Sequence, residues 1–332
     1  MAEGNSNTEI KKRDWGAQNK ALRNVVKEAA EDLVGAALRW DEERNAPCKR
    51  GRGRPKEFSD EMIEKAMTLK AVTGMDWRKA AGLIAAILSA VGLEGISCTQ
   101  LFDRAKALAM ANTYSKDPLP GVLIAGVQNA GNRERRTVAV DASGIRLNIM
   151  GKWLTKQWNG KEVTGWIKLH VAADVDTNEI LAFVITTERI GDNTCFVRLM
   201  DMLRDEGVDV KKVLADTSYD DGDNWNLMKE RGIEFFANPK KNSTGKFNGC
   251  SSRGLQVLRR MEIGETEWKI EIGYGMRWKI ECTFSDFKRL FGDMITSRKP
   301  LWMALELYWR TLAHNLYKGI LMRHRAEGRA SC

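Results

Sequence analysis

Three acidic residues stand where a fold can bring carboxylates together from distant parts of the chain. Asp141 follows the strand-like run VAV, Asp216 follows VLA, and Glu281 lies in the helical segment YGMRWKIECTFSDFK. Carboxylates gathered in this way can hold two divalent ions about 4 Å apart. Such a pair of ions can activate a nucleophilic oxygen and stabilise the leaving oxygen in phosphodiester chemistry. The three acids therefore favour the cutting and joining of DNA.

The segment around Glu281 divides into faces when it is drawn as a helix with about 100° per residue. One edge collects four residues that could do chemistry: Tyr274, Arg277, Glu281 and Lys288. The adjoining flank is apolar and contains Ile280, Phe284, Phe287 and Phe291, and the solvated back contains Lys279, Thr283, Asp286 and Arg289. This pattern predicts a helix that packs its apolar flank against a sheet. Gly275 can delay the helix start, which would leave Tyr274 just before it.

Each candidate also has an ordinary structural interpretation. An acid at the end of a strand is often a turn residue, and Arg277 with Glu281 could be a surface ion pair four residues apart. His170 is expected to be a structural residue or one that supports a ligand, and not a ligand itself, because no metal-ligating partner lies near it in the sequence. Asp220 and Asp221 could be simple N-terminal acids of the next helix.

The four residues of the chemical edge follow the spacing Tyr, two residues, Arg, three residues, Glu, six residues, Lys. This spacing resembles the signature of the DDE transposases encoded by insertion sequences. DASG at Asp141 is similar to the family's D-S-T-G, with Ala142 in place of a common Ser or Thr. GWIKLHVAAD resembles its G-x-x-K-x-H segment, and ADTSYDD resembles its A-D-x-x-Y-D motif. The resemblance extends over residues 40 to 325.

The resemblance implies specific roles for these residues. Asp141, Asp216 and Glu281 would be the catalytic metal ligands for two ions, Mg²⁺ or Mn²⁺, with no organic cofactor. Tyr274, Arg277 and Lys288 would hold the transposon end near the scissile phosphate. The expected partners are double-stranded DNA, both terminal inverted repeats and target DNA, and a second copy of the chain in a homodimer on paired ends.

The charge balance agrees with a nucleic-acid partner. The chain has 53 Lys and Arg against 44 Asp and Glu, a net charge of +9, which favours a polyanion. Arg52 and Arg54 lie in the basic run PCKRGRGRP, whose RGRP is the core of an AT-hook that enters the minor groove of A·T-rich DNA. A solvated linker is the alternative.

Cysteines and apolar runs indicate the compartment. The six cysteines are scattered without a C-x-x-C pair, so neither a zinc site nor a disulfide framework is expected. The most apolar run, 80–93, is too short to span a bilayer, and the first residues lack the apolar core of a secretory signal. We expect a cytoplasmic, nucleoid-associated protein with no membrane partner.

The N-terminal third has helical periodicity. A first helix is expected over Asp14 to Asn45, and three shorter ones over 59–74, 76–90 and 99–112, with Ser59 and Asp76 as N-caps. Three helices in this order resemble a helix-turn-helix module whose third helix enters the major groove. A small bundle used for dimerisation or packing is the alternative, because the third helix has few basic residues.

The rest of the chain favours strands mixed with helices. Strands are expected over 136–147, 166–174, 179–187, 213–216 and 233–237, and helices over 193–206 and 224–231. A polar loop over 240–254 and a hairpin over 258–273 precede the helix with Glu281, and a last helix covers 301–325. This order predicts an α+β fold, with a helical module followed by a ribonuclease-H-like mixed sheet.

These elements suggest a domain organisation. We expect an N-terminal helical segment at 1–45, a basic AT-hook-like linker at 46–58, a helix-turn-helix-like module at 59–118, a linker at 119–136, a ribonuclease-H-like catalytic domain at 137–325 with an insertion at about 240–273, and a tail at 326–332.

The preferred hypothesis is the transposase of an insertion sequence. Two alternatives use the same fold. One is a DNA-binding protein that no longer cuts DNA, against which the intact set of three acids argues. The other is a structure-specific nuclease, against which the helical module and the Tyr-Arg-Glu-Lys signature argue.

Overall fold

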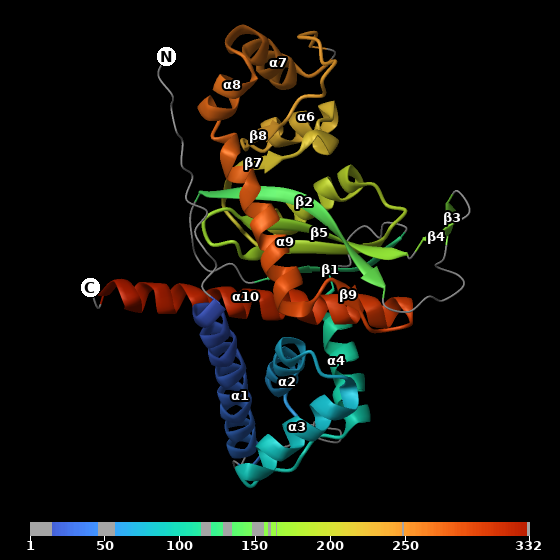
Figure 1. Cartoon of the computed structure of the whole chain (residues 1–332), viewed down its shortest axis with the longest axis vertical. Coiled ribbons are helices and arrows are strands. Elements are labelled where there is room, and N and C mark those ends of the chain that lie inside the picture. Colours follow the sequence, from blue (N-terminus) through green and yellow to red (C-terminus); the bar gives the residue numbers. More distant parts are fainter. Residues whose placement is uncertain are drawn as a thin grey trace, which may run out of the picture.

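A computed structural model describes residues 15–45, 57–113, 121–128, 135–147, 156–158, 161–163, 165–247 and 249–330. The molecule has a helical part and a sheet part, with one long helix between them (Figure 1). The helical part contains α1 (Trp15–Asn45), α2 (Asp60–Thr73), α3 (Trp77–Ala90) and α4 (Cys98–Ala111), and the long helix is α10 (Pro300–Ala330).

Local capping explains where the short helices begin and end. The Ser59 side chain accepts a hydrogen bond from the Met62 N–H, and Gly74 ends α2 with a φ of 64°. Asp76 caps α3 by accepting from two backbone N–H groups. The N-cap of α4 is Ser97 in a reciprocal capping box with Gln100, so this helix begins at Cys98 rather than at Thr99.

The sheet part has one mixed sheet in the strand order β1-β6-β5-β2-β7-β8. Its strands are β1 (Val122–Val127), β2 (Arg136–Leu147), β5 (Trp166–Asp174), β6 (Ile180–Thr187), β7 (Val210–Ala215) and β8 (Glu234–Ala237). β2, β5, β6 and β1 are antiparallel neighbours, whereas β7 and β8 continue parallel to β2. From β2 onward the five main strands therefore have the spatial order third, second, first, fourth, fifth, which is the ribonuclease-H-like arrangement. The expected fold class is confirmed.

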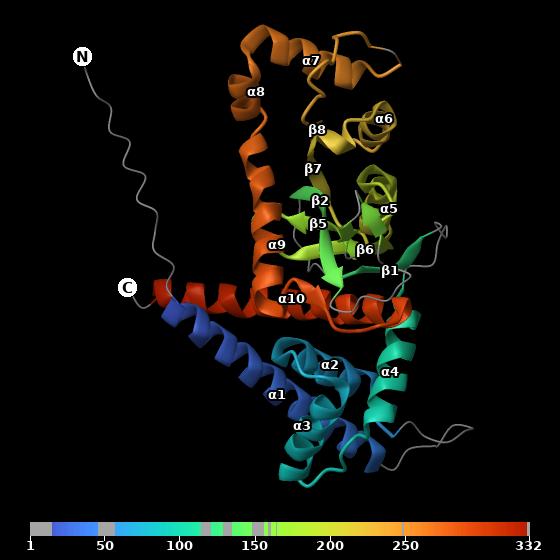
Figure 2. The same cartoon turned by 45° about the vertical axis from the view of Figure 1, so that its right-hand side comes forward.

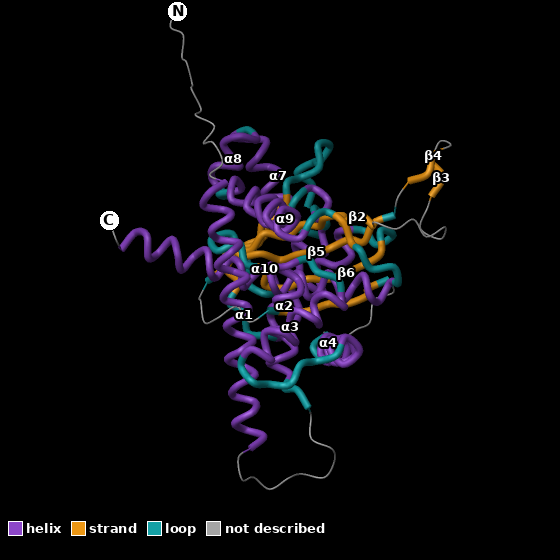
Figure 3. Tube along the Cα trace, turned by 60° about the horizontal axis from the view of Figure 1, so that its bottom comes forward, coloured by secondary structure: helices purple, strands orange, loops and turns teal. Residues whose placement is uncertain are grey.

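Three further short strands complete this part. β9 (Met294–Ile295) pairs with the end of β2, and β3 (Lys156–Trp158) with β4 (Lys161–Val163) forms a separate two-stranded sheet (strands are orange in Figure 3).

Helices cover both faces of the main sheet (Figure 2). One face packs against α9 (Trp278–Phe291) and α10 through side chains that include Ala139, Leu169 and Val171. The other face packs against α5 (Phe196–Asp205) and α6 (Gly222–Glu230) through side chains that include Val140 and Val213. The alternation of buried residues along β2 serves both faces, as expected for a central strand.

The hairpin expected over 258–273 is wrong. This segment forms two helices, α7 (Ser251–Ile263) and α8 (Glu265–Glu271), with a break at Gly264, whose φ is 89°. Trp268, Ile270 and Ile272 alternate with polar residues as they would in a strand. Trp268 and Ile272, which are four residues apart, are buried, whereas Ile270 is 75% exposed. The buried period is therefore that of a helix.

The segment 119–136, expected as a linker, also contributes structure. Its residues Val122–Val127 form β1, which pairs antiparallel with β6 at the edge of the sheet. Within the described residues, no helix is long and apolar enough to cross a membrane.

Candidate active site

Asp141 and Asp216 lie beside each other at the point where two parallel strands separate. Val140 of β2 pairs with Ala215 of β7, and the next residue in each strand is one of the two acids. Asp141 continues β2 opposite Val171 of β5, whereas Asp216 leaves β7 and caps a short 3₁₀ turn, η2 (Thr217–Tyr219). Because β2 and β7 are parallel neighbours in this register, the sheet places the two carboxylates beside each other although they are far apart in the sequence.

Burial and charge both act on Asp141. Its side chain is 21% exposed, and one carboxylate oxygen accepts a hydrogen bond of 2.8 Å from the Ala142 N–H. Burial and, to a smaller extent, the negative charge of Asp216 raise the pKa of Asp141 to about 6, against the opposing effects of the Ala142 N–H and Arg277. The charged form of Asp141 is therefore less favourable at this position than in water.

Asp216 keeps one carboxylate oxygen available. Its Oδ1 accepts hydrogen bonds from the Ser218 N–H at 2.8 Å and from the Ser218 hydroxyl at 2.5 Å. Within the described part of the chain, no hydrogen bond reaches its Oδ2. Ser218 thus orients the carboxylate while leaving an oxygen free to bind a cation.

Arg277 links Glu281 to Asp141. A 3₁₀ turn, η3 (Tyr274–Arg277), leads into α9, which carries Glu281 in its first turn. Nη2 of Arg277 is 2.7 Å from Oε1 of Glu281, and Nη1 is 3.5 Å from Oδ2 of Asp141. The guanidinium therefore bridges an acid of the sheet and an acid of the helix, which a simple surface pair four residues apart would not do.

Tyr274 has a structural contact that the helical wheel did not predict. It is 9% exposed, and its hydroxyl donates a 2.7 Å hydrogen bond to the carbonyl of Ala215, the residue before Asp216. Burial raises the pKa of Tyr274 to about 12. The wheel assumed α-helical geometry, but residues 274–277 form a 3₁₀ turn, so Tyr274 points toward β7 instead of along the outer edge.

The remaining wheel positions are partly as expected. Ile280, Phe284 and Phe287 are buried against the sheet, and Lys288 is partly exposed two turns beyond Glu281. Thr283, expected on the solvated back, is fully buried because α10 packs against that side of α9, where Lys318 pairs with Asp286. Arg52 and Arg54 lie outside the described residues.

Asp220 has a role that was not predicted. It is 2% exposed, and its carboxylate accepts hydrogen bonds from Arg253 at 2.8 and 2.6 Å, from the Trp225 indole at 3.1 Å and from the Lys240 N–H at 3.1 Å. It therefore ties α6 and α7 to the loop that follows β8. Only its place in the ADTSYDD motif hinted at this role. Asp221 is the N-cap of α6, as expected of a helix N-terminal acid.

Lys168 and His170 lie on the face of β5 away from Asp141. The Lys168 ammonium contacts Asp192 at 2.9 Å and the Ile190 carbonyl at 2.8 Å. His170 is fully buried beside Thr186, at 2.9 Å, and burial lowers its pKa to about 4. These contacts are structural, as expected for His170.

The acids have the chemistry of a site for hard divalent cations, which prefer carboxylate oxygens. The disfavoured charge of the buried Asp141 and the free oxygen of Asp216 fit such an ion. Among the described residues, however, no group of three or more His, Cys, Asp or Glu side chains is arranged to hold a metal as it stands. Arg277 supplies the positive charge between Asp141 and Glu281 in this conformation.

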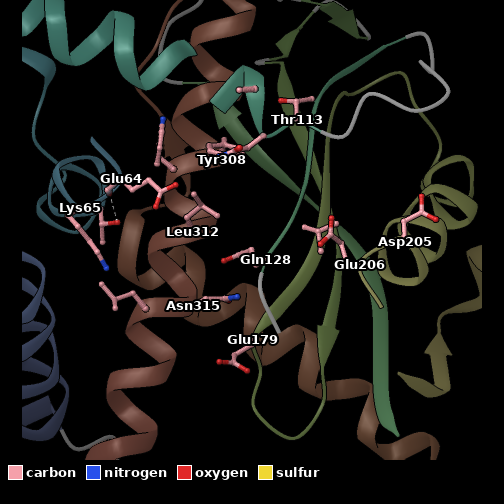
Figure 4. Close-up of a pocket in the computed structure, with 16 residues that line it drawn as sticks. Glu64, Lys65, Thr113, Gln128, Glu179, Asp205, Glu206, Tyr308, Leu312 and Asn315 are labelled. Atoms are coloured by element: carbon pink, nitrogen blue, oxygen red, sulfur yellow. Dashed lines mark hydrogen bonds between the residues drawn. The ribbon is translucent and has the colours of Figure 1, made fainter. Parts of the chain in front are cut away.

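A cleft of about 880 Å³ opens elsewhere, among α2, α4, β1 and α10 (Figure 4). Its lining includes Glu64, Glu179, Asp205 and Glu206, with Lys65 as the cation among the described lining residues. Burial raises the pKa of Glu64. The negative lining disfavours a DNA backbone, and none of the lining residues belongs to the acidic centre formed by Asp141, Asp216 and Glu281.

Comparisons with known proteins give a family match and distant structural likenesses. A family model described as a transposase DDE domain matches residues 132–316, a range that contains Asp141, Asp216 and Glu281. A solved piggyBac transposase synaptic complex with hairpin DNA is 10% identical, with a TM-score of 0.38 over 93% of this chain and 76% of that chain. A Drosophila P element transposase strand transfer complex is 11% identical, with a TM-score of 0.30 over 90% and 70%. Both structural likenesses are distant.

Proposed function

Since the chain belongs to the transposase DDE domain family, we propose that it is the transposase of an insertion sequence. It binds the terminal inverted repeats of its element, cleaves DNA at the element ends and joins the freed 3′ hydroxyl to target DNA. The observation that carries this proposal is the placement of Asp141 beside Asp216 on adjacent parallel strands, with Arg277 linking Asp141 to Glu281 of α9.

In this proposal the three acids hold two Mg²⁺ or Mn²⁺ ions. When bound, such ions promote attack on the phosphodiester and stabilise the leaving oxygen. Ser218 orients Asp216, and Tyr274 fixes the end of β7 through the carbonyl of Ala215. Both contacts fix the position of the Asp216 carboxylate at the end of β7. A fixed carboxylate supports accurate placement of the reacting DNA strand.

Arg277 and Lys288 are proposed to bind phosphates that flank the scissile bond. A guanidinium offers a planar fork that matches two phosphate oxygens, whereas an ammonium acts as a point charge. Arg277 is 20% exposed at the edge of the acidic centre, and Lys288 lies on the same helix. The hydroxyl of Tyr274 is buried against Ala215, so Tyr274 supports DNA binding only indirectly, by holding the end of β7.

Recognition of the element ends is proposed to reside in residues 1–118, divided as expected from the sequence. Helices α2 to α4 would form the helix-turn-helix-like module, and Arg52 with Arg54 would contact the minor groove of A·T-rich ends. The packing alternative has support for α4, because Phe102 contacts Trp302 of α10 and Arg104 pairs with Asp60. Joining two ends requires a homodimer on paired DNA.

The function is tested with the full chain and duplexes that carry the inverted repeats bracketing its gene. With Mg²⁺ or Mn²⁺, we expect cleavage at the repeat ends and joining to a target plasmid, and a chelator should stop both. Random duplexes should bind more weakly, with steep salt dependence for both kinds of DNA. Tight binding to the repeats without any cleavage under these conditions would support the non-cutting alternative instead.

A further inference from the structure

Arg277 contacts two of the three acids of the acidic centre, and these acids come from different elements. We propose that Arg277 is a gate on this centre. Its guanidinium binds Asp141 and Glu281 until a DNA phosphate binds the guanidinium instead. Both carboxylates are then available to a divalent cation. This inference rests on the proposed function and adds a coupling between DNA binding and cation binding.

The contacts of Arg277 go beyond those of a helical surface pair. Its 2.7 Å contact with Glu281 is the i, i+4 pair of a helix, but the 3.5 Å contact with Asp141 reaches the central strand β2. The guanidinium carbon is also 6.0 Å from the centre of the Tyr274 ring. With 20% of its side chain exposed, Arg277 is held on several sides yet remains accessible to solvent and DNA.

The guanidinium of Arg277 and a divalent cation would compete for the same carboxylate oxygens. Oδ2 of Asp141 and Oε1 of Glu281 face the guanidinium, and a divalent cation bound by these oxygens would lie against that charge. Two positive groups within a few ångströms repel each other strongly at a partly buried site. Occupation by Arg277 also agrees with the absence of a ready three-residue metal group among the described residues.

A DNA phosphate is a suitable competitor for Arg277. Arginine forms two parallel charge-assisted hydrogen bonds with phosphate oxygens, as it does with carboxylates. Release of Glu281 costs little, because its side chain is 61% exposed and can rotate toward the aspartates. By thermodynamic linkage, DNA must then increase the affinity for the cation, and the cation must increase the affinity for DNA at this site.

The gate is tested by calorimetric titration of Mn²⁺ into the full chain, with and without a short duplex, after subtraction of Mn²⁺ binding to the duplex alone. The variants are Arg277→Gln and, as a control on the same helix, Arg289→Gln, whose parent residue pairs with Asp286. Without DNA, Arg277→Gln should bind Mn²⁺ about tenfold more tightly than wild type, the equivalent of one charge-assisted contact.

In wild type and in Arg289→Gln, the duplex should tighten Mn²⁺ binding, and in Arg277→Gln this gain should be clearly smaller. Equal or weaker Mn²⁺ binding by a folded Arg277→Gln protein would overturn the gate. If that variant does not fold, absence of any gain from DNA in wild type would overturn it.

Asp216→Asn separates this inference from the proposed function. This substitution should weaken Mn²⁺ binding whether or not Arg277 is a gate, because Asp216 does not contact Arg277. Loss of Mn²⁺ binding in Asp216→Asn, together with unchanged binding in Arg277→Gln, contradicts the gate alone. If Asp216→Asn binds Mn²⁺ as tightly as wild type, both the acidic centre and the gate are contradicted.

Discussion

Asp141 is held in surroundings that oppose its own negative charge. Its folded-state pKa is raised from 3.8 to about 6, mainly by burial. Between these two values the folded protein keeps a proton that the unfolded chain releases, so the free energy of unfolding falls as pH rises through this window. The loss becomes complete about one pH unit above the folded-state pKa. A site that is partly destabilised when empty is a natural place for a cation to bind.

Asp141→Asn should therefore stabilise the protein above pH 6 while leaving its stability near pH 3.5 almost unchanged. The amide oxygen can still accept the Ala142 N–H, so the main change is the removal of a buried charge. We expect a gain of about 1 to 3 kcal/mol at pH 7.5 in chelator, measured by urea unfolding. Asp103→Asn, at an exposed position of α4, is the control. A variant less stable than wild type at pH 7.5 would contradict this assignment.

Tyr274 shows how far single residues could be predicted. Its importance followed from the Tyr-Arg-Glu-Lys spacing, but its hydrogen-bond partner is a backbone carbonyl of β7 that no side-chain pattern marks. The second partner of Arg277 was missed for a similar reason, because Asp141 lies on a strand far away in the sequence. Spacing identified the residues, and only the tertiary fold defines what they touch.

Tyr274→Phe should cost about 1 kcal/mol of stability, because the buried Ala215 carbonyl loses its donor. It should reduce cleavage more than DNA binding, since the hydroxyl supports Asp216 and does not reach the surface. Thermal unfolding, end cleavage and gel-shift affinity measure the three effects. Tyr308→Phe on α10 is the control and should leave cleavage intact. Loss of DNA affinity in Tyr274→Phe with normal stability would indicate a direct DNA contact.

At the scale of elements, strand ends and helix caps were readable from sequence, whereas α7 and α8 were not. The bounds of β2 and β5 match the expected ranges, because β-branched runs were interrupted by clear turn residues. In 258–273 the alternation of apolar and polar residues imitated a hairpin. A short helix buries too few residues for its period to show in the sequence.

The helical assignment of α8 predicts different effects for two apolar residues on alternate positions. Trp268→Ala should destabilise the protein by about 3 kcal/mol, because Trp268 is fully buried and its indole donates to Gln256. Ile270→Ala should be nearly neutral, since Ile270 is 75% exposed. Denaturant unfolding of both variants makes the comparison. Similar large losses of stability at both positions would support a hairpin instead, because Trp268 and Ile270 would lie on the same face of a strand.

At the scale of the whole molecule, helical and sheet parts share one core. Leu33 of α1, Ile63 of α2 and Leu101 of α4 belong to the same buried cluster as Trp309 of α10 and Val171 of β5. Asn315 of α10 also exchanges two hydrogen bonds of 2.8 Å with the backbone of Ile180 in β6. The order of elements predicted the ribonuclease-H-like sheet. The central place of α10 could not be predicted, because helical periodicity does not say which neighbours a helix has.

This architecture places the acidic centre beside the central strands β2 and β7 of a sheet that is braced on both faces. The central claim is that these three acids are essential for DNA cleavage. The direct measurement is end cleavage beside gel-shift affinity for Asp141→Asn, Asp216→Asn and Glu281→Gln, with Glu271→Gln on α8 as the control. We expect each of the three variants to bind DNA as wild type does and to lose cleavage, while the control cuts normally. Near-normal cleavage by any of the three would contradict its place in the acidic centre.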